Sequence, residues 1–357
     1  MEYIDLDKTK NFEKLKKAKK TDVKSLLSKE RIKEKNIPLG GGLRYNYASE
    51  PVNDEIVDLL QALSDEMSLV EKYRAILSGE MMNVGEKRLV LHHLTRGNVL
   101  GAKIIADGEN KDDFYKGELN RIEKFSNDVR DGKIVGSTGK PFTTVCQIGI
   151  GGSDLGPRAL YLALKGWARG NGVKELEGKF ISNVDPDDAS DVISTIDLET
   201  TLFVLVSKSG TTQETLTNRD LVLNALKNSP IDGFDANKHM VAVTSKTSPL
   251  AKDESMLDSF FIDDYIGGRY SSTSAVGAVI LSLAFGFDTF KKLLDGAHEE
   301  DVLSNESNIR KNGALMDALI GVYLRNVMNY PSTAILPYSQ ALSRFPAHLQ
   351  QLYMESN

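Results

Sequence analysis

The chain has 357 residues, of which 44 are Lys or Arg and 50 are Asp or Glu, so its formal net charge is −6. Charged residues at 26% and hydrophobic residues at 41% exclude a disordered or collagen-like chain, and the acidic balance argues against a general nucleic-acid binder. A single cysteine, Cys146, excludes an intrachain disulfide and a cysteine-cluster metal site. The start MEYIDLDKTK lacks the features of a signal peptide, and no apolar run reaches the ~20 residues that span a membrane. We therefore expect a cytoplasmic protein with no nucleic-acid or membrane partner.

The N-terminal third is predicted to be mainly helical. Residues 8–35 hold 12 Lys or Arg against 4 Asp or Glu. Their apolar stripe consists of Phe12, Leu15, Val23, Leu26 and Leu27. Such a run could contact RNA or an acidic membrane, but a solvated helical arm is the preferred interpretation. Residues 37–49 (IPLGGGLRYNYAS) are typical of a turn-rich linker. Apolar spacing predicts a helix over residues 52–63 and a second helical region over residues 90–105 that is broken near Gly97.

Short strands and helices alternate in the middle of the chain. The predicted strands are Thr143–Ile148, Phe180–Val184, Leu202–Val206, Met240–Thr244 and Phe260–Ile262. Helices are predicted over residues 157–165 and 213–226. This alternation indicates an α/β fold, with a parallel sheet covered by helices on both faces. Ligands of such sheets bind beyond the carboxyl ends of the strands.

The C-terminal part continues with predicted helices and one further strand. The helices are expected over residues 273–285, 288–302, 309–329 and 340–353, and the strand over residues 333–336. We expect a helical arm and linker over residues 1–50, a helical region over residues 51–135 and an α/β domain over residues 136–300. Residues 301–357 then hold a connecting helix and the start of an incomplete second α/β domain.

The first candidate motif is Gly149–Pro157 (GIGGSDLGP), between a predicted strand and helix. Glycines let the backbone approach a ligand, and a helix N-terminus offers N–H groups to an anion. Asp154 stands where a dinucleotide fingerprint needs its third glycine, and residues 136–141 (GSTGKP) lack the P-loop spacing. A tight turn capped by Ser153 or Asp154 would explain the segment equally well.

The second candidate motif is Ser207–Thr215 (SKSGTTQET), which follows the most apolar strand. Four hydroxyls, one lysine and one glycine lie within six residues, namely Ser207, Lys208, Ser209, Gly210, Thr211 and Thr212. The alternative is an N-cap by Thr212, with Glu214 or Thr215 in the first turn. One cap needs one hydroxyl and not four, so we favour a monophosphate site at this helix N-terminus.

The third candidate motif is Gly267–Ser274 (GGRYSSTS), where Arg269 beside two glycines could approach a ligand and stabilise an oxyanion. Alternatively, Arg269 pairs with Asp263 or Asp264 and organises the turn. The tail HLQQLYMESN is typical of an amphipathic helix end, and its periodicity gives Glu355 no role. The five histidines are not at metal-ligand spacing, so we expect structural or surface histidines and no metal site.

Together, GIGGSDLGPRAL, SKSGTTQET, DDYIGGRYSSTSAVG and LQQLYMESN, in this order, resemble the glucose-6-phosphate isomerase family. The resemblance runs from about Gly40 to the end of the chain. It implies the sugar isomerase (SIS) domain fold, a parallel five-stranded α/β sandwich. It also implies interconversion of glucose 6-phosphate and fructose 6-phosphate through a cis-enediol, in glycolysis and gluconeogenesis. No cofactor is implied, and the expected assembly is a homodimer.

The resemblance also assigns roles to single residues. The sugar-phosphate cradle would comprise Gly152, Ser153, Ser207, Lys208, Ser209, Gly210, Thr211 and Thr212. Arg269 matches the arginine that stabilises the enediolate, Gln351 a substrate contact, Glu355 the catalytic base and Glu214 a further active-site carboxylate. Gly210 stands where many relatives carry an aromatic residue, a departure that leaves the hydroxyls in place.

Relatives continue beyond Met-Glu-Ser-Asn with a part that carries a ring-opening histidine and a late lysine. The resemblance therefore implies a truncated chain with little or no activity on cyclic sugar phosphates. Two other functions stay open, a sugar-phosphate-binding regulatory module and an isomerase of another hexose phosphate such as mannose 6-phosphate. A regulatory module needs neither Arg269 nor Glu355, so the presence of both favours the enzyme.

Overall fold

The computed structural model of the chain describes residues 3–355 and divides into two compact units. The first unit comprises Met1–Leu89, Arg96–Ile104 and Leu294–Ala334. The second comprises Val90–Thr95, Ile105–Leu293 and Ile335–Asn357. The expected division at residues 50, 135 and 300 follows neither unit and stays a prediction.

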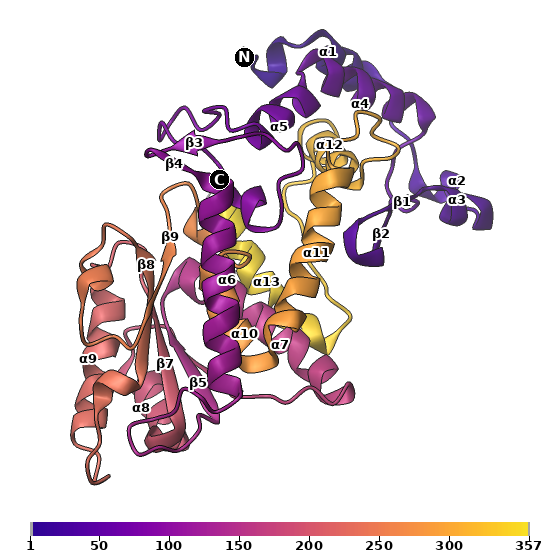
Figure 1. Cartoon of the computed structure of the whole chain (residues 1–357). Coiled ribbons are helices and arrows are strands. Elements are labelled where there is room, and N and C mark those ends of the chain that lie inside the picture. The colour runs from indigo at the N-terminus through magenta and orange to yellow at the C-terminus, as the bar shows by residue number, and fades with distance from the viewer. Residues whose placement is uncertain (1–2, 356–357) are drawn as a thin grey trace. The chain divides into compact units, whose positions relative to one another are not determined.

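The first unit is mainly helical. Its helices are α1 (Lys10–Lys17), α2 (Val23–Leu26), α3 (Lys29–Glu34), α4 (Asp54–Glu66), α5 (Leu69–Leu77) and α12 (Gly313–Asn326) (Figure 1). Helix α11 (Phe287–Leu303) ends in this unit. α1 packs on α4 because Phe12 and Leu15, from the apolar stripe of the basic arm, are buried in the core of the unit. Leu27 of the same stripe is exposed, so the stripe is only partly used.

The predicted linker is wrong in one respect, because it contains a hairpin. Strands β1 (Asn36–Pro38) and β2 (Arg44–Asn46) pair antiparallel, with Ile37 opposite Tyr45. Gly41 and Gly42 between them have φ values of 65° and 75°, a left-handed conformation that glycine adopts without steric cost. The three glycines therefore form a turn within the hairpin and not a flexible connection.

The second unit is built on a five-stranded parallel sheet, as the sequence predicted. Its strands are β5 (Thr144–Ile148), β6 (Glu177–Ile181), β7 (Thr201–Val206), β8 (Met240–Ser245) and β9 (Ser259–Ile262). Their order in the sheet is β6-β5-β7-β8-β9. Every residue of β5 and β7 is buried, as expected for apolar strands covered on both faces.

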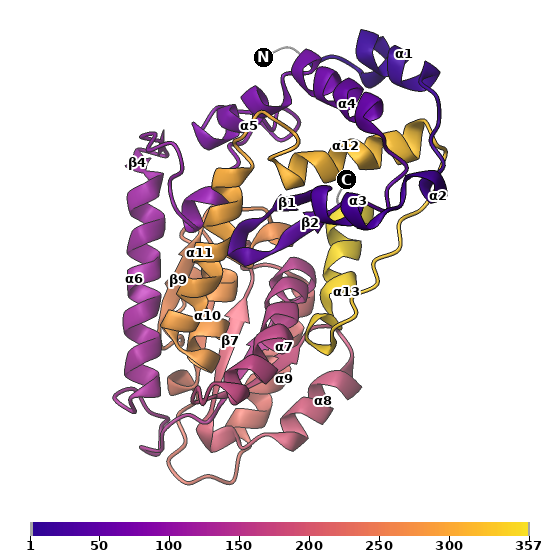
Figure 2. The ribbon, with the colours of Figure 1, turned by 90° about the vertical axis from the view of Figure 1, so that its right-hand side faces the viewer.

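Helices cover both faces of the sheet (Figures 1 and 2). They are α6 (Lys111–Arg130), α7 (Leu155–Gly170), α8 (Pro186–Thr195), α9 (Gln213–Lys227) and α10 (Ala275–Phe285). α8 and α9 share a core with Cys146, Phe203 and Leu205 on one face. α10 packs on the other face and is itself covered by α6 and α7, which explains why all of its residues are buried. Burial also raises the pKa of the Cys146 thiol.

Several predicted elements are wrong. Residues 90–105 form only the short 3₁₀ helix η3 (His92–Thr95) before the expected break at Gly97 (φ 147°), and no helix after it, where Gly101 (φ 63°) interrupts the chain again. Residues 333–336 are exposed and form no strand, since none of the described strands pairs with them. The expected C-terminal helix is divided into η9 (Gln340–Leu342), α13 (Phe345–Gln350) and the single-turn π-helix η10 (Gln351–Glu355). α6 lies in the region over residues 51–135 that was predicted to be helical, although its bounds were not predicted, and α8 was not predicted.

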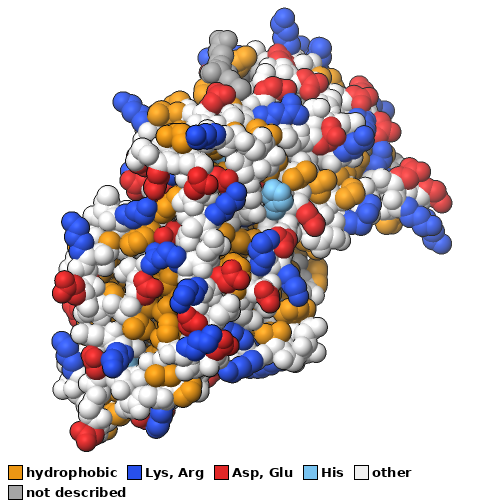
Figure 3. Space-filling view, viewed as in Figure 1, with side chains coloured by type: hydrophobic (Ala, Val, Ile, Leu, Met, Phe, Trp, Pro, Cys, Tyr) orange, Lys and Arg blue, Asp and Glu red, His pale blue; other side chains and the backbone are white. Residues whose placement is uncertain are grey.

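The surface carries mixed charge, with acidic and basic side chains interspersed on the face that Figure 3 presents. Of the helices within residues 3–355, none combines the length and the apolar character that crossing a bilayer requires.

Candidate active site

The order of the strands opens a crevice between the carboxyl ends of β5 and β7. These strands are neighbours, yet α7, which follows β5, and α9, which follows β7, lie on opposite faces of the sheet. The two loops therefore diverge as they leave the sheet. In parallel α/β sheets such a switch point is where ligands bind.

A cleft of about 390 Å³ lies at this place, entirely within the second unit. Its lining comprises Ile150, Gly152, Ser153, Val206, Ser207, Lys208, Ser209, Thr212, Thr215, Ser245, Thr247, Ser248, Asp264 and Gly268. The first two sequence motifs thus meet in one cleft, and the third contributes Gly268. Hydroxyls from the loops after β5, β7 and β8 dominate the polar lining.

The turn after β7 is held by its own hydroxyls. Ser207 Oγ accepts a hydrogen bond from the N–H of Gly210 (3.1 Å) and donates to Thr212 Oγ1 (3.1 Å). Thr211 donates from both its N–H and its hydroxyl to Ser209 Oγ, at 3.2 and 3.0 Å. Gly210 has φ 67°, and a Cβ there would collide with Ser248 Oγ. The turn as built therefore requires glycine at position 210.

Thr212 is the N-cap residue of α9, but its side chain makes no capping hydrogen bond. The capping alternative therefore does not account for its hydroxyl. Glu214, in the first turn of α9, has an exposed side chain and is not among the residues that line the cleft. Its role as an active-site carboxylate stays a prediction.

Lys208 joins the second turn to the third. Its Nζ donates to the backbone carbonyl oxygens of Ile266 (3.0 Å) and Asp264 (3.3 Å) and lies 3.5 Å from Asp264 Oδ1. Backbone carbonyls at a fixed distance hold the ammonium group in one place. The lysine thus connects the loop after β7 with the loop after β9. Hydroxyls supply most of the remaining polar lining of the cleft.

The turn after β5 packs directly on the turn that carries Arg269. A Cβ on Gly152 would overlap the carbonyl group of Gly268, the first residue of the 3₁₀ helix η8 (Gly268–Tyr270). Ser271 Oγ donates to Gly152 O (3.4 Å), and Gln147 Nε2 donates to Ser153 O (2.6 Å). Arg269 lies exposed in η8, next to the cleft-lining Gly268.

The C-terminal segment lies against the same turns. η9 and α13 pack on α7, and η10 contacts η8. Gln351 Nε2 lies over Gly151, where an added Cβ would be 2.9 Å away, and Gln351 Oε1 is buried with no hydrogen-bond partner among residues 3–355. Glu355 is exposed at the end of η10. Arg269 is next in the chain to the cleft-lining Gly268, and Gln351 lies against Gly151. Neither of them, nor Glu355, is part of the lining, and the role of Glu355 stays a prediction.

Comparison with known proteins gives the family. The family model described as "Phosphoglucose isomerase" matches residues 46–357, which is most of the chain. The chain belongs to the phosphoglucose isomerase family. It is 54% identical to glucose-6-phosphate isomerase of Treponema denticola, covering 100% of this chain and 68% of that protein. It is 45% identical to the protein of the same name from Borreliella burgdorferi strain ZS7, covering 100% and 67%.

A solved structure supports the same family. The crystal structure of a glucose-6-phosphate isomerase from Chlamydia trachomatis matches with a TM-score of 0.89 at 37% identity, over 99% of this chain and 67% of that one. The SIS-type α/β fold expected from the sequence is thereby confirmed for this member of the phosphoglucose isomerase family.

The cap alternative for the first motif is not what this family member uses. Asp154 makes no capping hydrogen bond at the start of α7. Instead its buried carboxylate pairs with Arg158 at 2.8 Å, and burial raises its pKa despite that arginine. Asp154 therefore has a structural partner of its own within α7.

Sequence reasoning missed part of the cleft. Ser245 ends β8, and Thr247 and Ser248 follow it. Their segment Ser-Lys-Thr-Ser repeats the Ser-Lys-Ser pattern after β7 and could have been noticed. Thr215 was considered only as part of a cap. The residue lines the cleft, and its hydroxyl is buried and has no hydrogen-bond partner among the described residues.

Proposed function

We propose that this chain is an aldose–ketose isomerase that interconverts glucose 6-phosphate and fructose 6-phosphate, with a place in glycolysis and gluconeogenesis. One observation carries the proposal. Hydroxyl-bearing loops after β5, β7 and β8 meet in a single cleft, and the Arg269 turn and the Gln351–Glu355 turn adjoin it. The family membership supports the same reaction.

The phosphate would bind among the hydroxyls of Ser207, Ser209, Thr212 and Thr215 at the N-terminus of α9. Backbone N–H groups and the positive end of the helix dipole favour an anion at such a place. Binding the phosphate, which does not react, holds the sugar carbons in a fixed position, so its binding energy can be used at the reacting end.

The reaction itself moves hydrogen without an external oxidant. Glu355 would take the proton from C2 of the open-chain aldose, while O1 gains a proton, to give a cis-enediol. The same carboxylate would return the proton to C1 while O2 loses one, which gives the ketose. Arg269 would stabilise the negative charge on the enediolate oxygen, a contribution of a few kcal/mol for a well-placed donor.

Deuterium incorporation tests the reaction even at a low rate of turnover. Fructose 6-phosphate incubated with the chain in D₂O should gain deuterium at C1, detected by NMR, since the enediol exchanges its proton with solvent. Binding of the sugar phosphate without incorporation would support the regulatory-module alternative. Faster exchange with mannose 6-phosphate than with glucose 6-phosphate would indicate another hexose substrate, and no binding of any of the three would overturn the proposal.

We also propose that the protein works as a homodimer in the cytoplasm. Large apolar side chains in the C-terminal segment of the second unit, including Tyr338 at 98% exposure and Leu336 at 66%, support a further protein contact. Light scattering should then give about twice the chain mass of 39.3 kDa. A monomer at micromolar concentration would contradict the dimer and leave the proposed reaction standing.

A further inference from the structure

We infer that His92 is a positioning residue for the turn that carries Arg269. Its Nε2 accepts a hydrogen bond of 2.8 Å from the backbone N–H of Gly267, two residues before Arg269. The inference rests on the proposed function, because Arg269 matters only if an enediolate forms. The sequence alone indicated a structural or surface histidine at this place.

Further contacts place η3 along the whole turn. The N–H of Leu91 donates to Tyr265 O (3.1 Å), and Thr95 Oγ1 lies 2.9 Å from Thr273 Oγ1. The imidazole of His92 meets the ring of Tyr270 edge-on, with centroids 5.4 Å apart. These contacts attach the loop at points before and after Arg269.

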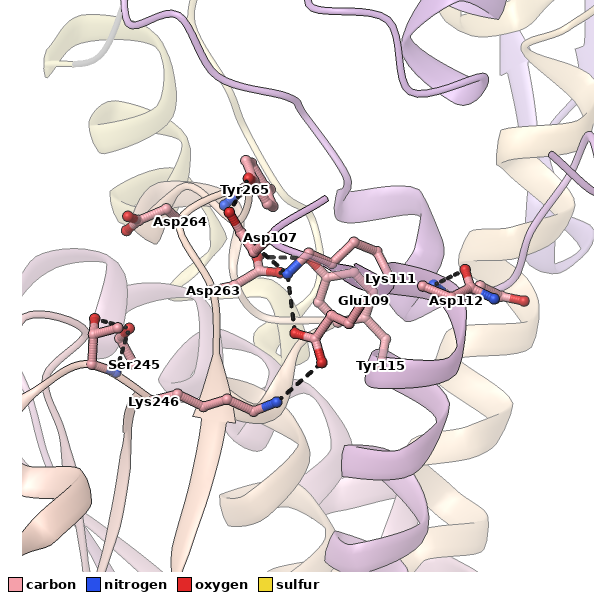
Figure 4. Close-up of polar contacts among 12 residues, drawn as sticks. Asp107, Glu109, Lys111, Asp112, Tyr115, Ser245, Lys246, Asp263, Asp264 and Tyr265 are labelled. Carbon is pink, nitrogen blue, oxygen red and sulfur yellow. Dashed lines mark hydrogen bonds and ion pairs between the residues drawn. The ribbon is translucent and has the colours of Figure 1, made fainter. Parts of the chain in front are cut away.

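The preceding part of the loop has a separate attachment. Figure 4 shows Asp263 and Tyr265 beside the buried Lys111, whose Nζ is 3.4 Å from Asp263 Oδ2. Tyr115 also donates to Asp263 at 2.7 Å. These bonds fix the loop only as far as Tyr265. Lys208 Nζ holds Ile266 O, and Ser271 Oγ donates to Gly268 O at 2.7 Å. His92 adds a restraint on Gly267 between these two points, where glycine restricts the backbone least.

The chemistry of the bond fixes the state of the ring. A backbone N–H can only donate, so Nε2 of His92 carries no proton and the neutral ring has its proton on Nδ1. Leucine would fill much of the same space but could not accept this bond. Glutamine places an amide oxygen at a reach similar to that of Nε2, whereas the asparagine side chain is one methylene shorter.

The loss of this acceptor should affect one end of the substrate. The hydroxyls after β7 and β8 are held by bonds within their own loops, in which His92 takes no part, so phosphate binding should persist. Arg269 would occupy its productive position less often, and stabilisation of an anionic enediolate should fall. The effect is therefore selective and can be measured without turnover.

Calorimetric titration of two ligands tests this selectivity. One is a phosphorylated aldonohydroxamate, which mimics the enediolate, and the other is glucitol 6-phosphate, which lacks both carbonyl and enediolate oxygen. In His92→Leu we expect at least tenfold weaker binding of the hydroxamate and glucitol 6-phosphate affinity within threefold of the wild type. His92→Gln should restore most of the hydroxamate affinity, and His92→Asn should not.

Each other outcome has a definite meaning. Equal weakening of both ligands, or no change in either, would overturn the positioning role. If His92→Leu does not fold, equal hydroxamate affinities in the Gln and Asn variants would overturn it instead. A wild-type chain that binds glucitol 6-phosphate but not the hydroxamate, or neither ligand, would refute the isomerase proposal and the inference with it.

Discussion

Thr215 occupies the third position of α9 and is one of the residues that line the cleft; its hydroxyl is buried and has no hydrogen-bond partner among the described residues. A buried polar group without a partner costs free energy unless a ligand or water satisfies it. This hydroxyl is therefore poorly explained by the stability of the free protein and well explained by a phosphate.

We predict that Thr215→Val will weaken binding of fructose 6-phosphate while leaving stability unchanged or slightly raised. Valine has nearly the same shape, and a hydrogen bond to a charged group contributes about 1.5–3 kcal/mol, so affinity should fall about tenfold to hundredfold. Calorimetry and urea unfolding measure the two quantities. Thr217→Val is the matched control, because Thr217 is exposed and lies two residues further along the same helix. Unchanged affinity in Thr215→Val would remove this residue from the cradle.

Glu355 stands in the last described turn, which contacts the Arg269 turn. We predict that Glu355→Gln will abolish deuterium exchange at C1 of fructose 6-phosphate, because the amide cannot accept the proton, and will leave binding within about threefold. NMR in D₂O and calorimetry give the two readouts. Exchange at the wild-type rate in this variant would reject Glu355 as the base.

At the scale of elements, the turn after β5 and the turn that carries Arg269 can approach closely because Gly152 has no side chain. Gly152→Ala should destabilise the protein by about 1–3 kcal/mol, since the new Cβ would overlap the backbone of Gly268 and force η8 away from the turn after β5. Gly268→Ala is the control, because a Cβ at that position meets nothing within 4 Å. Urea unfolding of both variants checks the difference, and equal stabilities would show that the two turns separate without cost.

A cluster of charged side chains around Lys111 connects the start of α6 with the chain before it and with the loops that follow β8 and β9 (Figure 4). Nζ of this buried lysine lies 3.1 Å from Asp107, 3.2 Å from Glu109 and 3.4 Å from Asp263. Burial alone would lower the pKa of Lys111, but the three carboxylates outweigh it and raise the pKa. Lys246, after β8, also reaches Glu109 at 3.3 Å. The start of α6 thereby holds the two loops that contribute Ser245 and Asp264 to the cleft.

Lys111→Met should therefore lower the free energy of unfolding by about 2–3 kcal/mol near neutral pH, a reduced value because Asp107 is largely exposed. Lys111 lowers the pKa of Asp107. The stability that this ion pair contributes is therefore present above the usual pKa of an aspartate, and it is lost as the pH falls through the lowered pKa of Asp107. Burial raises the pKa of Asp263. The charge of this carboxylate therefore costs stability at neutral pH, and the cost disappears as the pH falls through the raised pKa.

The gap in the free energy of unfolding between wild type and Lys111→Met should consequently narrow between pH 7 and pH 3, because Asp263 is protonated first and Asp107, whose pKa is lowered, only at the acid end of this range. Urea unfolding at both pH values measures this change. Lys116→Met, on the exposed side of the same helix, should show no such gap. A gap that stays constant with pH would mean that packing, and not charge, accounts for the loss.

At the scale of the whole molecule, the sequence predicted the features that depend on residues close together in the chain. β5 follows from a short run of strand-forming residues and β7 from a continuous apolar run, each followed by a Gly-rich or Ser-rich turn, and both strands were found where expected. The sheet order then brings the two turns together, a consequence of general rules for parallel sheets.

The remainder depends on contacts between distant positions, which one sequence does not reveal. Lys111 contacts Asp263, and His92 contacts Gly267, although more than 140 residues of chain separate the partners in each pair. The bounds of α6 were not predicted within the helical region, although Phe114, Ile122 and Phe125 form a buried face with helical spacing. The predicted strand over residues 333–336 had the right composition but finds no neighbour to pair with in the described chain.

The burial of Cys146 has a practical consequence. Its sulfur lies in β5, the strand whose end opens into the cleft, so a thiol reagent can react only when the centre of the sheet opens. A ligand held by the native cleft should slow this labelling by the factor 1 + [L]/Kd. The rate of modification of one sulfur atom, followed by mass spectrometry, would then report sugar-phosphate affinity in the unaltered chain. Labelling that is indifferent to saturating fructose 6-phosphate would mean that the ligand does not bind the folded sheet.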